Sequence, residues 1–238
     1  MQFPRHEVAA DELTVEDRAV YGIAPRLFSD QTVFLVASGP SLRSVDVSVL
    51  KPFPVVAINL TFKLCPWAPV MYWTDFRFWT WYRTEIDEFK GSIFSACPQD
   101  IRMGERGTRL KLSGSEGLDP DTRKLRHGNN SGYAAINLAL HFGAKRIVLV
   151  GYDMRQGDDG ELHWHQDHPS KTKPHVFASM IANYKTLPRA LREHFPSVTV
   201  VNATEGSALD MFPRATLGDE IMLAAEQQVK PCRSLSRV

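Results

Sequence analysis

Apolar residues in this chain form short continuous runs that alternate with stretches of helical spacing. Six runs, most of them rich in β-branched residues, are typical of buried strands. They predict strands at 32–37, 55–58, 70–73, 92–96, 146–150 and 198–201. Between them, apolar positions three and four residues apart predict helices at 41–49, 76–89, 133–142 and 177–191.

The ends of these helices carry recognisable signals. Ser41 is expected to cap the first helix, Ser131 is expected to cap the helix that Ser131-Gly132 opens, and Gly143 is expected to end that helix. Pro188 is expected to kink the last one.

The alternation of strands and helices predicts an α/β fold with a doubly wound, mostly parallel sheet of the Rossmann-like kind. We expect one nucleotide-binding domain at 32–222, preceded by a leader at 1–31 that packs on it. Residues 99–128 have weak periodicity and predict an irregular insertion or lid, and residues 223–238 predict a frayed tail.

Composition narrows the function. With 28 Lys and Arg against 27 Asp and Glu in 238 residues, the chain lacks the charge excess that general nucleic-acid binding or attraction to acidic membranes uses. We expect no membrane span, because no apolar run approaches about 18 residues, and residues 1–10 lack the apolar core of a signal peptide. Three scattered cysteines, Cys65, Cys97 and Cys232, predict free thiols and a cytoplasmic protein.

Small and polar residues follow the predicted strands, at the edge where such sheets bind ligands. After the first strand, Ser38-Gly39-Pro40-Ser41 favours a phosphate or nucleotide, although it is neither a Walker loop nor GxGxxG. The other candidates are Asn59, Asp75, Asn130, Ser131, Gly132, Gly151 and Asp153. Each alone is compatible with ordinary turn or cap chemistry, but together they indicate a site.

The segment from His163 to His168 reads HxHxDH. This spacing is similar to the zinc motif of metallo-β-lactamase-like hydrolases, but few further ligands follow it. One histidine acting as a general base is the better functional interpretation, and a surface loop with incidental histidines is the alternative.

Four of the five tryptophans lie between Trp67 and Trp81 among basic residues. They could stack nucleic-acid bases, but their spacing favours the core, with one or two lining an acceptor groove.

Four segments taken together resemble a known family: VASGPSL at 36–42, VAIN at 56–59, NSGY at 130–133 and IVLVGYD at 147–153. The chain resembles small bacterial sialyltransferases that build lipooligosaccharide and the related 6-hydroxymethylpterin diphosphokinase-like (MptE-like) family, as well as proteins of tailed phages and prophages. The resemblance spans about residues 32–212.

The resemblance implies a CMP-sugar site at Gly39, Ser41, Asn59, Ser131 and Gly132. It also implies that His168, within Asp167-His168-Pro169-Ser170-Lys171, deprotonates an acceptor hydroxyl in a transfer that needs no metal or other cofactor. The partners would be a nucleotide sugar and a glycan or other hydroxyl acceptor, with self-association left open.

One position departs from the family pattern. The family has a tyrosine two residues after the aspartate of Gly-x-Asp, and this chain has Arg155 there. Arg155 could neutralise the leaving phosphate instead. Two alternatives remain: a diphosphokinase in which Asp75 and Asp153 hold Mg²⁺ and triphosphate, and a non-catalytic phage nucleotide-binding or morphogenesis protein.

Overall fold

The main sheet of the protein has seven strands, and every pair in it is parallel. The computed structural model describes residues 21–99, 101, 103, 107–165 and 175–229, and all that follows concerns these residues. In spatial order the strands are β5 (Gly107–Arg109), β4 (Ser92–Ser95), β3 (Val70–Trp73), β2 (Val55–Ile58), β1 (Thr32–Val36), β8 (Arg146–Val150) and β9 (Thr199–Asn202). A separate pair, β6 (Lys111–Leu112) and β7 (Lys124–Leu125), lies beside it.

The strand order reverses at β1. From β1 the chain moves outward through β2, β3, β4 and β5, and then returns to place β8 on the other side of β1, followed by β9. Phe34 pairs with Val55 of β2 and with Val148 of β8. The loops after β1 and β8 therefore start side by side at the carboxyl edge, at the switch point where doubly wound sheets bind ligands.

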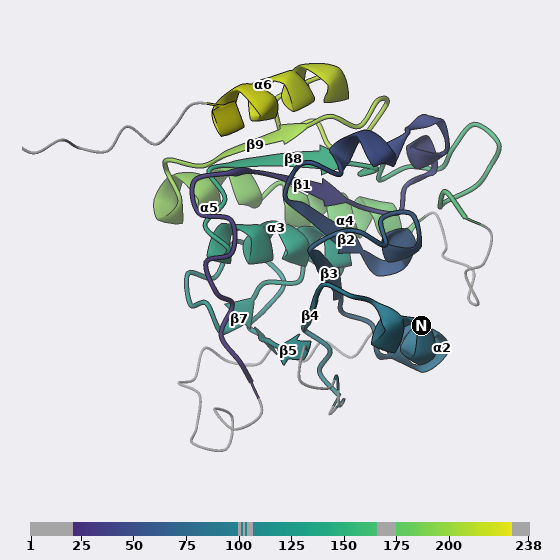
Figure 1. The fold of residues 1–238 in the computed structure, drawn as a ribbon, viewed down its shortest axis with the longest axis vertical. Coiled ribbons are helices and arrows are strands. Elements are labelled where there is room, and N and C mark those ends of the chain that lie inside the picture. Colours follow the sequence, from purple (N-terminus) through teal and green to yellow (C-terminus); the bar gives the residue numbers. More distant parts are fainter. Residues whose placement is uncertain (1–20, 100, 102, 104–106, 166–174, 230–238) are drawn as a thin grey trace, which may run out of the picture.

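Helices cover both faces of the sheet (Figure 1). One face packs against α3 (Ser131–His141), α4 (Val176–Tyr184) and α5 (Leu187–His194). The other packs against α2 (Phe76–Glu88), α6 (Leu217–Val229) and the 3-10 helices η1 (Pro40–Ser44), η2 (Val47–Leu50) and η3 (Asn59–Lys63). Alternation along each strand makes this possible, because neighbouring side chains point to opposite faces.

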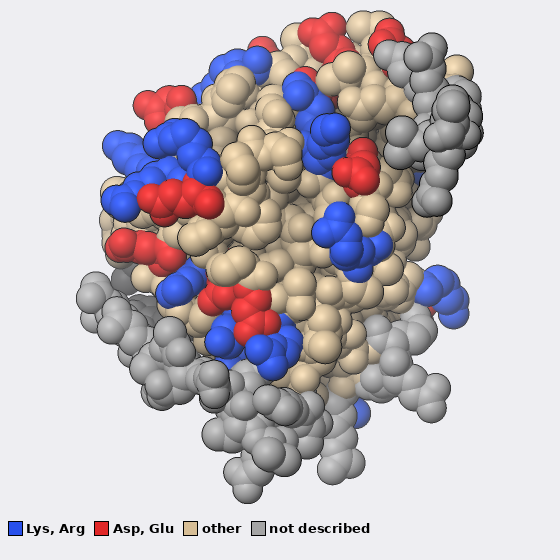
Figure 2. Space-filling view, turned by 90° about the vertical axis from the view of Figure 1, so that its left-hand side faces the viewer, with Lys and Arg blue, Asp and Glu red and all other residues tan. Residues whose placement is uncertain are grey.

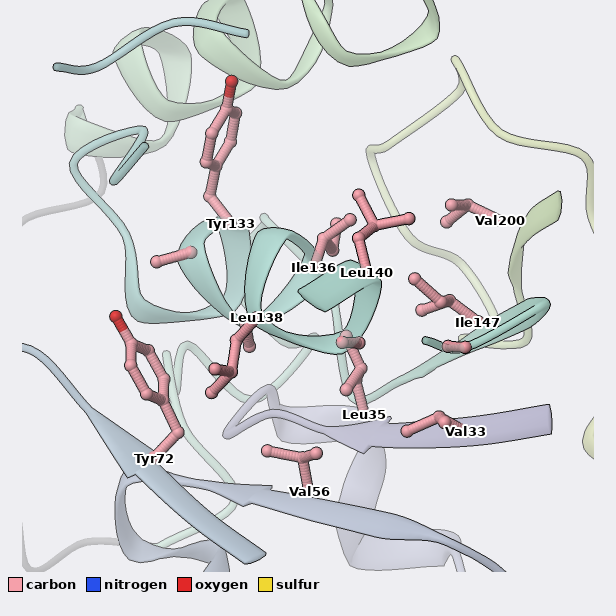
Figure 3. Close-up of a cluster of buried hydrophobic side chains, with 14 of the residues drawn as sticks. Val33, Leu35, Val56, Tyr72, Tyr133, Ile136, Leu138, Leu140, Ile147 and Val200 are labelled. Atoms are coloured by element: carbon pink, nitrogen blue, oxygen red, sulfur yellow. The ribbon is translucent and has the colours of Figure 1, made fainter. Parts of the chain in front are cut away.

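The helix α3 lies at the centre of one hydrophobic core (Figure 3). Every residue of α3 from Gly132 to His141 is buried, and most of them are apolar. Leu138 points toward Tyr72 and Val56 of the sheet, and Ile136 and Leu140 lie on the other side of the helix (Figure 3). A helix this deeply buried fixes its own amino end relative to the strand ends.

The predicted α/β class is confirmed, and each predicted strand is present to within a residue or two at its ends. Continuous apolar runs gave these strands because both faces of a parallel sheet are buried. The predicted break near Pro188 is also present, since α4 ends at Tyr184 and α5 begins at Leu187.

The predictions for two helix starts are wrong. The stretch 41–49 forms η1 and η2 instead of one α-helix, and Ser41 does not cap either of them. Asn130, and not Ser131, caps α3: its side-chain oxygen accepts the N–H of Tyr133 at 3.1 Å. Asn and Ser are near-equal caps, so sequence alone does not choose between adjacent positions.

The insertion and the tail are more regular than predicted. Within 99–128, β5 joins the main sheet, and Leu110, Leu118 and Leu125 are buried in the core. The tail predicted to fray from residue 223 is helical to Val229 as part of α6.

The core interpretation of the tryptophans is confirmed for two of them. Trp73 is fully buried, and it stacks on the nearly buried Trp79 with ring centroids 5.9 Å apart. Cys65 and Cys97 are buried free thiols, as predicted for them.

The surface charge and the character of the helices agree with the sequence analysis. In Figure 2, Lys and Arg side chains are interspersed with Asp and Glu on an otherwise uncharged face. Among the helices of the described part of the chain, none has the length and apolar character that crossing a bilayer requires.

Candidate functional site

The turn after β1, Ser38 to Ser41, lies against the turn after β8. The N–H of Gly39 donates to the carbonyl of Gly151 at 2.9 Å. A Cβ on Gly39 would lie 1.8 Å from Oδ2 of Asp153 and 2.6 Å from the Gly151 carbonyl oxygen, so only glycine fits there. Pro40 then starts η1 and is buried. The structure thus brings two predicted segments together at the switch point.

Asp153 holds this turn. Its carboxylate accepts the N–H of Ser41 at 3.0 Å and the Ser41 hydroxyl at 2.8 Å. Burial raises the pKa of Asp153, and the bonds from Ser41 act against that rise. The N–H of Ser41 is therefore engaged within the protein. Asp153 orders the turn from within the protein.

The backbone from Gly151 to Met154 is bent sharply. Gly151 has φ +73° and Met154 has φ +50°. Thr204 Oγ1 accepts the N–H of Tyr152 at 2.9 Å, and the Ser207 hydroxyl donates to the Tyr152 carbonyl at 2.5 Å. The loop after β9 thus fixes the bend. Sequence analysis missed Thr204 and Ser207, for which a polar loop after the last strand was the only available signal.

Arg155 is exposed and points to the same loop. Its Nε donates to the carbonyl of Gly206 at 2.6 Å, and its Nη1 lies 3.4 Å from the Asp158 carboxylate. In this arrangement the guanidinium is engaged by the Gly206 carbonyl and the Asp158 carboxylate.

Asn59 stands at the carboxyl end of β2 with φ +54°, a left-handed conformation that few residues other than Gly adopt. It is half-buried and begins η3. Next to it, the carbonyl of Ile58 accepts the Ser38 hydroxyl at 3.4 Å and the Thr61 hydroxyl at 2.9 Å. Ser38 therefore links the ends of β1 and β2.

Asp75 lies further along the same edge, after β3. It caps α2 by accepting the N–H of Arg77 at 2.9 Å, and it pairs with the Arg77 guanidinium at 2.7 Å. Three strand spacings separate β3 from β8, roughly 14 Å at about 4.8 Å each. Asp75 and Asp153 are thus placed too far apart at the sheet edge to share one ion.

The amino end of α3 completes the edge. Asn130 Oδ1 accepts the hydroxyl of Tyr184 at 3.0 Å as well as the capped N–H. A Cβ on Gly132 would lie 2.9 Å from the ring of Tyr152, so Gly132 is required for close packing. Ser131 is half-exposed at the first turn. This end of α3 is therefore held rigidly against the segment after β8.

Residues 156–165, which we call the strap, return to the Gly39 turn. The N–H of Trp164 donates to the Ser38 carbonyl at 3.1 Å. The rings of His163 and His165 stack with centroids 5.4 Å apart. The predicted base His168 and the adjacent Asp167 lie outside the described residues, so the catalytic and zinc hypotheses for them stay predictions.

Within the described ranges, no three His, Cys, Asp or Glu side chains are grouped so as to hold a metal ion. A pocket at the opposite edge of the sheet is lined by Thr32, Gln227 and Gln228 among others, and by none of the predicted site residues.

Comparison with known proteins gives no assignment: no family model, no curated protein and no solved structure matches the chain. The fold and the edge described above define the class, a doubly wound α/β protein in which the predicted Gly39, Ser41, Gly151 and Asp153 lie together at the switch point.

Proposed function

We propose that this chain is a nucleotide-binding transferase, a glycosyltransferase that takes a CMP-type sugar donor at the carboxyl edge beside β1. The observation that carries the proposal is the position of the residues with a positive φ angle. Of the four non-glycine residues with positive φ among those described, Asn59, Asn129 and Met154 lie at this edge. Such conformations are costly and concentrate at ligand sites.

The roles follow the resemblance and the positions of the residues. The Ser38–Ser41 turn, Asn59 and the Ser131-Gly132 end of α3 would hold the nucleotide, because they lie along one strand-end edge. Asn59 would offer its amide and Ser131 its hydroxyl, whereas the turn would contribute its shape, since the N–H groups of Gly39 and Ser41 are bonded within the protein. His168 would take the proton of an acceptor hydroxyl while its oxygen attacks the anomeric carbon. A new C–O bond then forms as the C–O bond to the CMP phosphate breaks, and the electron pair leaves with CMP.

The proposal gives Arg155 and Asp153 other roles than the sequence analysis did. Arg155 is bound to Gly206, so the proposal does not depend on it to neutralise phosphate. Asp153 supports the turn instead of touching the ligand directly, because both of its oxygens accept from Ser41.

The diphosphokinase alternative has no specific observation in its favour. Its two carboxylates, Asp75 and Asp153, stand at separate strand ends, and each is engaged by neighbouring residues. Tight ATP binding with Mg²⁺ would be its signature in the experiment below.

The test is thermal unfolding of the full chain with CMP, UDP, GDP and ATP plus Mg²⁺. A ligand that binds only the folded state at 100 times its Kd adds about 2.7 kcal/mol, which raises the Tm of a domain of this size by roughly 5–10 °C. We expect this rise with CMP. No rise with any nucleotide would contradict the proposal and favour a non-catalytic protein.

A matched pair of variants localises the site. Asn59→Gly keeps the backbone free to hold φ +54° while removing the side-chain amide, so the fold should persist and CMP affinity should fall at least 10-fold. Asp30→Gly is the control, because Asp30 also has positive φ, at +61°, but lies before β1 at the opposite edge. Equal CMP affinity of both variants and the wild type would remove Asn59 from the site.

A further inference from the structure

The strap, residues 156–165, is folded on itself by short-range bonds. The N–H of Gly157 donates to the Glu161 carbonyl at 2.7 Å, and the N–H of Glu161 donates to Asp159 Oδ1 at 3.1 Å. Gln156 donates from its amide to the Gly160 carbonyl at 2.5 Å. These bonds give the strap a local shape, but they do not attach it to the rest of the domain.

One side chain outside the strap binds it at three points. Arg43, in the last turn of η1, donates from Nε to the Trp164 carbonyl at 3.1 Å and from Nη2 to the His163 carbonyl at 2.9 Å. Its Nη1 also pairs with the Asp159 carboxylate. One planar guanidinium thus binds three groups spread over six residues of the strap, a geometry that a lysine ammonium does not reproduce.

The strap lies directly on the turn that the nucleotide would approach. Besides the Trp164 N–H bonded to Ser38, Gly157 comes so close that a Cβ there would lie 3.2 Å from Cβ of Pro40. Trp164 itself packs against the core on this side of the sheet. The attachments of Arg43 are solvent-accessible, since its side chain is 35% exposed and that of Asp159 is 52% exposed.

We infer that Arg43 is a latch that holds the strap closed on the Gly39 turn, and that breaking its bonds opens the strap without unfolding the domain. Strap opening would control access to the Gly39 turn at the carboxyl edge. The latch itself stands on the contacts above, whereas its effect on ligand entry rests on the proposed nucleotide site.

Hydrogen–deuterium exchange of the full chain tests the latch. In Arg43→Ala, amides of residues 157–165 should exchange at least 10-fold faster, while those of β1, β8 and α3 keep their wild-type rates, because only the strap opens. Arg43→Lys should show the same local opening, since it keeps the charge and loses the fork. Arg189→Ala, which breaks an exposed ion pair with Glu193 on α5, is the control and should leave the strap unchanged.

The outcomes separate the two proposals. Unchanged exchange of 157–165 in both Arg43 variants overturns the latch, whatever nucleotide the protein binds. If Arg43→Ala speeds exchange throughout the sheet, the Arg43→Lys variant decides between the two interpretations. Faster exchange of the strap alone in Arg43→Lys supports the latch, and faster exchange of the sheet as well overturns it. If the wild type binds CMP, faster CMP association in Arg43→Ala supports gating, and an unchanged rate restricts the latch to shaping the strap.

Discussion

At the scale of single residues, the switch point depends on a carboxylate that the domain uses for itself. Asp153 is 3% exposed and holds Ser41 through two hydrogen bonds. Its charge is partly offset by these bonds, yet burial dominates and raises its pKa. The ionised form therefore weakens the folded state at neutral pH, and the two bonds are what retain the residue there.

Substitutions of Asp153 separate these two effects. Asp153→Ala should lower the free energy of unfolding by about 1–3 kcal/mol, because it leaves the Ser41 N–H without its acceptor. Asp153→Asn keeps an oxygen for that N–H and removes the buried charge, so it should lose far less. Urea unfolding at pH 7 measures both.

The pH dependence gives the second readout for Asp153. Since its pKa is raised in the folded state, the wild type gains stability from this residue as pH falls toward 3.8, and Asp153→Asn should lack that gain. An Asn variant as unstable as the Ala variant at pH 7 would show that the charge itself is needed.

At the scale of elements, α3 organises the insertion through polar side chains. The Asn137 side-chain oxygen accepts the N–H of Asp119 at 2.9 Å and that of Arg126 at 3.1 Å. Nε2 of His141, one turn later, lies 2.9 Å from the carbonyl of Lys124. In the described part of the insertion the strands β5, β6 and β7 are short, so these polar contacts, which the hydrophobic pattern does not reveal, hold it in place.

Acid should loosen this attachment. Burial lowers the pKa of His141, so between its folded value and about 6.5 the unfolded chain takes up a proton that the folded chain does not. Stability should therefore fall as pH drops below about 6.5. His141→Gln should reduce the difference in urea midpoint between pH 7.5 and pH 5.5.

The same urea measurement on a second histidine variant tests whether the acid sensitivity belongs to His141. His127 also has its pKa lowered by burial, so His127→Gln is the matched comparison. The pKa of Asp121, at about 2, affects stability only at pH values below about 4 and does not enter this window. A pH dependence unaltered in His141→Gln would assign the acid sensitivity elsewhere.

At the scale of the whole molecule, α6 closes one face of the sheet over contacts that are distant in sequence. Arg146 at the start of β8 binds Glu220 of α6 with two bonds, at 2.6 and 2.8 Å. Thr32 at the start of β1 donates to Gln227 at 2.7 Å. These contacts place the last described helix across β1 and β8, next to the strand pair that defines the switch point (Figure 1).

Removing one partner of the ion pair should cost more than removing both. The Glu220 side chain is only 5% exposed, so Glu220→Ala leaves Arg146 without its counter-ion and should lower the free energy of unfolding by about 3 kcal/mol. The double variant Arg146→Met, Glu220→Leu should lose much less. Urea unfolding of the three proteins tests this, and additive losses would contradict it.

The sequence by itself determined the class of fold and the limits of six strands. Both faces of a parallel sheet are buried, so β1, β2, β3, β4, β8 and β9 each contain a run of apolar residues, whereas the short strands β5, β6 and β7 do not. It also determined that Gly39, Asn59, Gly151 and Asp153 follow strand ends, since small and polar residues there break the apolar runs.

Only the tertiary structure decided how those residues work together. Ser41 was expected to cap a helix and instead binds Asp153, which lies 112 residues away. Arg43 carried no motif, yet it meets the strap 116 to 121 residues later in the chain. Residues 223–229 continue α6, whose Ala224 packs in the core and whose Glu220 binds Arg146, 74 residues earlier. The local spacing of apolar residues determines whether a segment can bury an apolar face. Which polar groups meet depends on the order of the strands in the sheet, and that order belongs to the tertiary structure.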